Sequence, residues 1–190
     1  MNPSKTARER VLETAEDLFY REGVRAVGID TIIARSGVAK MSLYRNFPSK
    51  DDLVVAYLEA RNRRFFANWD RAVGSEDAAP RARLRGLIEA TLKRVSQAGY
   101  RGCPFLNSAA EFPAPDHPAR AVISEHKREV RARLLGLCRD LKARNPETLT
   151  AQLIVLLDGV YASAGSLTAS ERAAVLKGAE AMIDASVNCP

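Results

Sequence analysis

What the sequence lacks narrows the class of protein. Its 190 residues contain no run of about 18 uncharged apolar residues, so we expect no membrane-spanning helix. The segment from Met1 to Arg10 is polar and has no apolar stretch of the kind that a secretion signal requires. These absences lead us to expect a cytoplasmic protein.

Cysteine and histidine are scarce. The chain has three cysteines, Cys103, Cys138 and Cys189, and two histidines. An odd number of widely separated cysteines favours free thiols in a reducing compartment over a disulfide framework. No cysteine or histidine pair has the spacing of metal ligands, so we expect neither a metal nor another cofactor.

Strand patterns are also missing. Apolar and polar residues do not alternate over any useful length, whereas apolar residues recur at helical spacing along most of the chain. The sequence therefore predicts an all-α fold of about nine helices. The expected helices cover residues 6–22, 29–36, 39–46, 49–73, 80–98, 105–111, 119–144, 146–165 and 170–187.

Several expected helix ends carry recognisable signals. Thr6 and Glu9 have the spacing of a capping box, in which each side chain satisfies a free amide of the other residue. Gly23 provides a C-terminal stop. Pro48 ends the third helix, and Ser49 caps the fourth, whose first turn is acidic.

The second and third expected helices are too short to form a core alone. They are joined by a tight turn at Gly37, and the first helix must pack across both of them, which is the arrangement of a helix-turn-helix module. Leu43 and Phe47 are the expected core anchors of the third helix. We expect residues 1–48 to form this DNA-binding domain and residues 49–190 a larger helical domain, with the fourth helix connecting them.

Basic residues are concentrated in the module. The formal net charge of the whole chain is +6, and the stretch from Thr31 to Lys50 holds four basic residues and no acidic residue. Such a local excess suits a surface that faces phosphates. A basic face that is only solvated is the alternative interpretation.

The segment from Gly37 to Leu53, GVAKMSLYRNFPSKDDL, closely resembles the DNA-binding signature of the TetR family of repressors. The similarity extends back through Ile29 to Arg35 and into the first helix, over roughly a third of the chain. A later segment, Gly102 to Asn107, is similar to one found in some subgroups of that family.

The resemblance implies a ligand-responsive transcriptional regulator that binds double-stranded DNA as a homodimer. The third helix of each subunit would enter the major groove of one half-site of a palindromic operator, and a small-molecule inducer would release the repressor. The residues that would contact DNA by position are Thr31, Lys40, Met41, Ser42, Tyr44, Arg45, Asn46 and Lys50.

The chemistry of these residue types agrees with that assignment. Arg45 is long enough to read a guanine edge, and lysines at positions 40 and 50 suit phosphate anchoring. Tyr44 would pack on the DNA backbone and donate its hydroxyl to a phosphate, with core packing as the alternative.

Two positions depart from the family pattern. Ala39 stands where a hydroxyl residue is common, so the third helix loses a side-chain N-cap worth about 1 kcal/mol. Asn46 stands where a histidine is common. It either contacts an adenine or is simply a polar residue that ends the helix.

The larger domain contains aromatic and polar residues that suit a small-molecule pocket. Ordinary core packing is the alternative for each aromatic residue. The candidate ligand-binding residues are Phe65, Trp69, Tyr100, Cys103, Phe105, Asn107, Glu111, Phe112, His126 and Tyr161.

Cys103 supports a second hypothesis, a repressor that senses electrophiles or oxidants through this thiol near a helix start. Catalysis would require Cys103 with His117 or His126, and no hydrolase signature surrounds them, so we do not expect an enzyme. If the basic helix were degenerate, a helical interaction protein without DNA binding would be the remaining alternative.

The last two expected helices suit a dimer interface. Residues 149–167 contain one ionised side chain, Asp158, so this region is almost entirely uncharged. Two such helices from each subunit would form a four-helix bundle. The small residues that allow close approach are Gly159, Ala162, Ala164 and Gly165, and the last helix adds Ala173, Leu176, Ala179, Met182 and Ile183.

Overall fold

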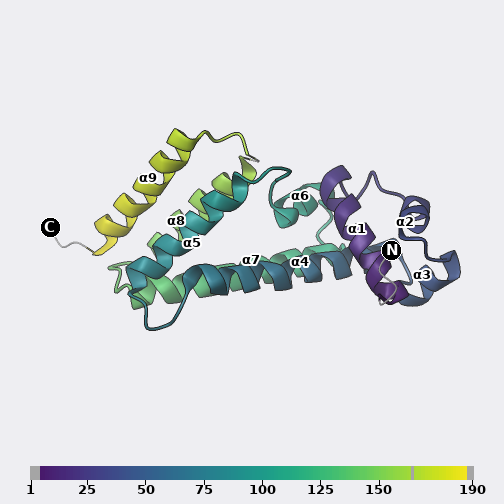
Figure 1. The fold of residues 1–190 in the computed structure, drawn as a ribbon. Coiled ribbons are helices and arrows are strands. Elements are labelled where there is room, and N and C mark those ends of the chain that lie inside the picture. The colour runs from purple at the N-terminus through teal and green to yellow at the C-terminus, as the bar shows by residue number, and fades with distance from the viewer. Residues whose placement is uncertain (1–4, 164, 188–190) are drawn as a thin grey trace. The chain divides into compact units, whose positions relative to one another are not determined.

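The computed structural model describes residues 5–163 and 165–187, and within these ranges the regular elements are all helices. The expected all-α fold is confirmed (Figure 1). The helices are α1 (Ala7–Glu22), α2 (Ile29–Ser36), α3 (Lys40–Asn46), α4 (Lys50–Val73), α5 (Pro80–Val95), α6 (Pro104–Glu111), α7 (Pro118–Asp140), α8 (Pro146–Ala162) and α9 (Ala169–Val187).

The chain forms two compact units. The N-terminal unit comprises Met1–Arg63 and Pro104–Glu125, and the C-terminal unit comprises Arg64–Cys103 and His126–Pro190. The helices α4 and α7 each contribute residues to both units. The sequence suggests a different boundary, between residues 48 and 49, which separates a DNA-binding domain from the rest of the chain. That boundary stays a prediction.

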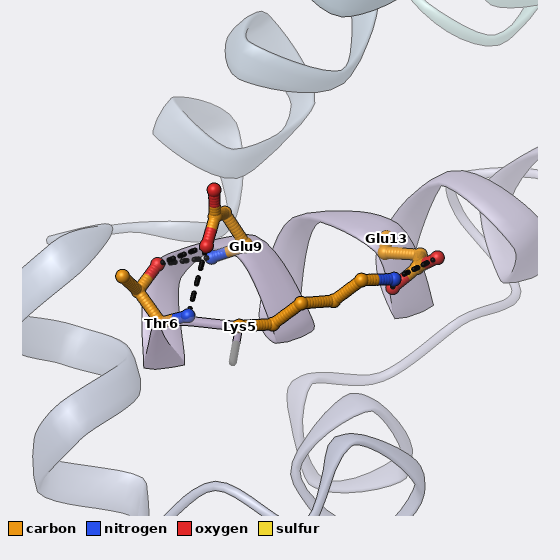
Figure 2. A network of polar contacts seen from close by, with 4 residues as sticks. All are labelled: Lys5, Thr6, Glu9 and Glu13. Atoms are coloured by element: carbon orange, nitrogen blue, oxygen red, sulfur yellow. Dashed lines mark hydrogen bonds and ion pairs between the residues drawn. The ribbon is translucent and has the colours of Figure 1, made fainter. Parts of the chain in front are cut away.

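The first helix begins with the expected capping box (Figure 2). The backbone N–H of Glu9 donates to Thr6 Oγ1 at 3.2 Å, and the backbone N–H of Thr6 donates to Glu9 Oε2 at 2.8 Å. Lys5, which precedes the helix, pairs with Glu13 of α1 at 2.6 Å. At the other end Gly23, with φ 90°, donates its N–H to Phe19 O, so both helix ends are satisfied as expected.

In the core of the N-terminal unit, α1 packs against the two helices that follow it. The first helix contacts both α2 and α3, which are joined at Gly37 in a left-handed conformation (φ 64°) that favours glycine. The two α3 anchors, Leu43 and Phe47, are 0% and 2% exposed, as expected. The other large buried side chains include Val11, Leu18, Phe19, Ile32, Leu53, Tyr57, Leu58 and Phe105.

The C-terminal unit is a bundle in which α5, α8 and α9 contact one another in pairs. One continuous apolar cluster occupies its interior, to which Cys138 on α7 belongs, as its position on the apolar side of the helix predicts. The most deeply buried members are Leu84, Ile88, Val95, Leu134, Cys138, Leu149, Leu153, Ala179 and Ile183.

Three helices end earlier than the sequence suggests. The expectation that α7 reaches Arg144 is wrong, because Lys142 adopts φ 59°. The N–H of Lys142 donates to Arg139 O and that of Ala143 to Cys138 O, a Schellman-type ending without glycine. Helix α5 ends at Val95 rather than residue 98, and α8 at Ala162 rather than residue 165. Ala164 and Cys189 lie outside the described residues.

Candidate nucleic-acid interface

One face of α3 is buried and the opposite face is exposed. Beside its buried anchors, the helix exposes Lys40, Met41, Tyr44 and Arg45. The Met41 side chain is 77% exposed and that of Tyr44 is 41% exposed, which is unusual for large apolar groups. The core-packing alternative for Tyr44 is therefore wrong. An exposed methionine and tyrosine beside two cations suit contact with a partner surface.

The backbone alone caps the start of α3. Ala39 has extended torsions (φ −61°, ψ 143°), and its carbonyl accepts from Ser42 N at 2.9 Å and Leu43 N at 3.1 Å. Among the described residues no side chain caps this helix, so the side-chain N-cap is missing as expected at Ala39. At the other end, the Asn46 side-chain amide donates to Ser42 O at 2.8 Å. This bond supports the interpretation of Asn46 as a helix-ending residue.

The cations of this surface have weak partners or none. Lys40 Nζ lies 3.7 Å from Asp30 Oδ1, and both side chains are largely exposed, so the pair contributes little and is easily exchanged. Arg45 and Tyr44 make no hydrogen bond, ion pair or ring contact within residues 5–163 and 165–187. Thr31 on α2 is exposed and Ser42 on α3 is half-buried.

Lys50 differs from the other predicted phosphate contacts because it is partly buried at the start of α4. Burial lowers the pKa of Lys50, while the nearby carboxylates of Glu111 and Asp51 act in the opposite direction. The helix start is ordered by a second capping box, in which Asp52 N donates to Ser49 Oγ at 3.1 Å and Ser49 N donates to Asp52 Oδ2 at 2.9 Å. A phosphate at Lys50 would therefore compete with Glu111.

Glu111 is a predicted ligand contact, but its carboxylate binds the backbone of the N-terminal unit. Its two carboxylate oxygens accept from Val24 N at 3.1 Å and Arg25 N at 2.7 Å. These amides follow the stop at Gly23, where the chain has no helical partner for them. Glu111 thus fastens α6 to the connection between α1 and α2.

His117 has a structural position beside this anchor. Its ring stacks on Phe112 with the centroids 4.1 Å apart, and Nε2 lies 3.5 Å from Asp51 Oδ1. Its Nδ1 accepts from Ala119 N at 3.2 Å and so caps the start of α7. The contacts of His117 are those of a capping residue rather than of a catalytic base.

The C-terminal unit contains a narrow cavity of about 40 Å³. Three predicted ligand residues line it, namely Phe65, Trp69 and Tyr161. The other lining residues are not among those predicted from the sequence, and they are Asn68, Ala72, Leu87, Ala90, Thr91 and Arg94.

The missed residues follow a pattern that the sequence contains. Residues 65, 68, 69 and 72 of α4, and residues 87, 90, 91 and 94 of α5, each lie at i, i+3, i+4 and i+7, which is one face of a helix. Thr91 lies within the apolar stripe of α5 and is only 3% exposed. A polar residue within an apolar stripe was the available signal.

Three further predicted ligand residues lie in the same unit as this cavity. The Tyr100 hydroxyl donates to Tyr161 O at 3.3 Å. His126 is 5% exposed and packs against Phe65 with ring centroids 4.7 Å apart. Burial, with a smaller effect from Lys127, lowers the pKa of His126 to about 4. Cys103 is buried.

The remaining four predicted ligand residues belong to the N-terminal unit, where Phe105 and Phe112 are buried. Asn107 is exposed and Glu111 makes the backbone contacts described above. The C-terminal cavity therefore gathers only part of the predicted set.

Two kinds of feature are absent from the described residues. No helix in this part of the chain is long and apolar enough to cross a membrane. No group of three or more histidine, cysteine, aspartate or glutamate side chains within it is placed to hold a metal ion.

Comparison with known proteins identifies the fold family. Residues 11–57 match the family described as bacterial regulatory proteins, tetR family, and residues 80–177 match the tetracyclin repressor-like C-terminal domain. The chain belongs to the TetR family. The resemblance inferred from the segment around α3 is thus confirmed, and it extends through most of the C-terminal unit.

A crystal structure of a TetR-family transcriptional regulator from Streptomyces coelicolor is 32% identical, with a TM-score of 0.89 over 96% of each chain. The transcriptional activator FasR of Mycolicibacterium smegmatis is 32% identical over 52% of this chain and 46% of its own. The transcriptional repressor NemR of Escherichia coli is 29% identical over 62% of this chain and 63% of its own. The chain spans less than two thirds of the length of these curated relatives.

Proposed function

We propose that this TetR-family protein binds a palindromic operator as a homodimer and that a small molecule in its C-terminal unit regulates this binding. The observation that carries the proposal is the outer surface of α3, where Tyr44 and Arg45 are exposed, with no partner among the described residues, on a helix whose other face is buried. Side chains held on a well-packed helix reach a groove at low entropic cost. We propose that Arg45 reads a base edge and that Lys40 and Tyr44 bind phosphates.

The proposal assigns repression rather than activation. Activators and repressors both occur among the relatives, as FasR and NemR illustrate by name. An operator-bound dimer that overlaps a promoter represses without any further surface, so repression requires the fewest additional contacts. The dimer would have two states that differ in the distance between its DNA-binding helices, and the inducer would act by binding these states with different affinity.

The dimer interface of this proposal lies on α8 and α9. Each helix has an exposed stripe of apolar, mostly small residues that helical spacing places on one side. Val155, 73% exposed, is the large apolar residue of the α8 stripe, and a contiguous exposed apolar stripe is typical of an interaction surface. Of the residues suggested from the sequence, Ala179 and Ile183 are 0% and 1% exposed within the chain and are core instead. The stripes are Ala151, Val155, Gly159 and Ala162 on α8, and Ala174, Gly178, Ala181 and Ala185 on α9.

A thiol sensor is not the function favoured here. Cys103 is only 8% exposed, so an oxidant reaches its sulfur only after local opening. The same residue was the only candidate nucleophile for catalysis. His117 caps a helix and His126 packs between aromatic rings, so these contacts support a regulatory role without catalysis.

The test of operator binding is selection of duplex DNA from a random pool by the purified full chain. We expect one palindrome to be enriched. Arg45→Ala should weaken binding to it by about tenfold or more, since a bidentate contact to guanine is worth about 1–3 kcal/mol. Arg139→Ala, an exposed arginine of α7 paired with Glu147, is the matched control and should bind normally. Absence of enrichment at low salt would refute the proposed function.

The dimer is tested by Val155→Glu, which places a charge on the exposed α8 stripe without disturbing the core. We expect the mass in solution, measured by analytical ultracentrifugation, to fall from dimer to monomer. Ala132→Glu on the exposed side of α7 should remain dimeric. A Val155→Glu dimer of unchanged stability would place the interface elsewhere.

A further inference from the structure

The cavity of the C-terminal unit offers a bound molecule hydrogen-bond donors and few acceptors. The Asn68 side-chain oxygen already accepts from Arg71, so its N–H groups remain as donors. Arg94 also lines the cavity, and no carboxylate within the described part of the chain pairs with it. No aspartate or glutamate is among the described residues that line this space.

The two hydroxyl groups of the cavity reinforce this donor excess. Thr91 Oγ1 donates its proton to Leu87 O at 2.9 Å, so in its 3.3 Å contact with Tyr161 the tyrosine is the donor. That contact is long for a hydroxyl pair, which usually lies near 2.7–2.8 Å. The Tyr161 proton is therefore available to a better acceptor.

A second arginine, Arg64, lies close enough to Arg94 for the two positive charges to repel each other. Burial lowers the pKa of Arg64 on α4, and repulsion from the Arg94 guanidinium lowers it further. An anion placed at Arg94 would relieve this repulsion and accept charge-assisted hydrogen bonds, which are stronger than neutral ones.

The rest of the wall is apolar and largely aromatic. Phe65 and Trp69 line one side and Leu87 the other, and aromatic walls favour an aromatic ring through edge and offset contacts. Small residues at positions 72 and 90 leave room between the helices.

We propose that this cavity binds a small aromatic carboxylic acid, with the carboxylate at Arg94 and Tyr161 and the ring between Phe65 and Trp69. The assignment rests on the proposed function, in which the C-terminal unit holds the inducer. It names the chemical class of that inducer from the donors and charges that the chain presents.

The size of the cavity requires a movement on binding. Its volume is about 40 Å³, whereas an engineered protein cavity that binds benzene measures about 150 Å³. Phe65 and Tyr161 are half-buried rings of the wall, while Trp69 is 6% exposed. Rotation of Phe65 about its side-chain bonds would enlarge the cavity and would change its ring contacts with His126 and Tyr161.

Trp69 makes the proposal directly measurable, because it is the only tryptophan of the chain and lines the cavity. Its fluorescence is recorded during titration of the full chain with benzoate, phenylacetate and hydrocinnamate, each beside its neutral amide, and with benzylamine. We expect at least one acid to change the emission saturably and to bind about tenfold or more tightly than its amide. Benzylamine should bind most weakly.

Two variants separate the charge of Arg94 from the net charge of the helix. Arg94→Gln should abolish the preference for acid over amide. Lys93→Gln removes the same charge from the exposed neighbouring position and should retain the preference. Equal binding of acid and amide, no emission change with any acid, or an unchanged preference in Arg94→Gln would overturn the proposal.

The same titration is repeated on the protein bound to its selected palindrome, with DNA release followed by fluorescence anisotropy. Release by the acid supports both the ligand class and the regulatory function. Operator binding without any response of Trp69 to acids refutes the ligand class alone. Acid binding by a protein that enriches no palindrome refutes the proposed function and leaves the ligand class supported.

Discussion

The stability of the C-terminal unit should depend on pH through His126. This side chain is 5% exposed and packs against Phe65 and Phe66, with ring centroids 4.7 and 5.6 Å away. Burial holds its pKa at about 4 in the folded chain, against 6.5 in the absence of structure. The folded state therefore keeps the imidazole neutral where the unfolded state protonates it.

The sign and size of the effect follow from linkage. Because the folded pKa is the lower one, the unfolded state binds more protons between pH 4 and 6.5, and stability falls as pH decreases through that window. The stabilisation is fully present above pH 6.5. At pH 5 the cost amounts to about 2 kcal/mol per chain, since each unit of pKa difference is worth about 1.4 kcal/mol.

The assay is urea unfolding of the wild-type chain and of His126→Leu at pH 7 and pH 5, at one protein concentration because dimerisation contributes to stability. Other groups titrate equally in both proteins, so the difference between the two pH responses isolates position 126. We expect the wild type to lose about 2 kcal/mol more than the variant. Equal losses in the two proteins would show that His126 is accessible to protons in the folded state and would refute the reasoning.

Two further predictions concern the N-terminal unit. Ala39→Ser should raise the free energy of unfolding by about 1 kcal/mol, because the extended backbone at this position suits a hydroxyl N-cap that α3 lacks; thermal unfolding measures it, and an unchanged or lower stability would contradict it. Glu111→Gln should speed hydrogen exchange at the amides of Val24 and Arg25, whose bonds to a charged acceptor are worth about 1.5–3 kcal/mol each. Glu59→Gln, on an exposed face of α4, is the control, and equal exchange in both variants would mean that Glu111 does not hold this connection.

Helix positions were predictable wherever a local signal fixes them. The capping box at Thr6, the stop at Gly23 and the turn at Gly37 depend on residues within a few positions of each other, and all three are present in the structure. The early end of α7 was not predictable in this way. It depends on a lysine in a left-handed conformation, which side-chain identity alone does not favour.

The exposed surface of α3 was predictable for a different reason. A short helix with two strong anchors, Leu43 and Phe47, has only one way to bury them, so the remaining residues must face outward. In this module, the residues that are exposed can therefore be predicted from the local sequence pattern. Only the weak pairing of Lys40 and the partial burial of Lys50 required the structure, because both depend on residues distant in sequence.

The ligand residues show the limit of the same reasoning. The candidates between residues 100 and 112 were chosen because aromatic and polar side chains suit a pocket, yet the chain passes from one compact unit to the other between Cys103 and Pro104. Residue type alone therefore joined residues whose surroundings differ, such as Tyr100 beside Tyr161 and Glu111 beside Val24.

Helical periodicity would have been the better guide to the cavity. On α5, an apolar stripe that is interrupted by Thr91 and followed one turn later by Arg94 marks a face where two polar groups meet a packed neighbour. Burying a polar side chain is unfavourable unless a partner compensates it. Thr91 has its partners in Leu87 and Tyr161, whereas Arg94 has no carboxylate among the described residues. Arg94 is half-buried at the wall of an aromatic cavity, and its guanidinium is the group with which the proposed carboxylate ligand would pair.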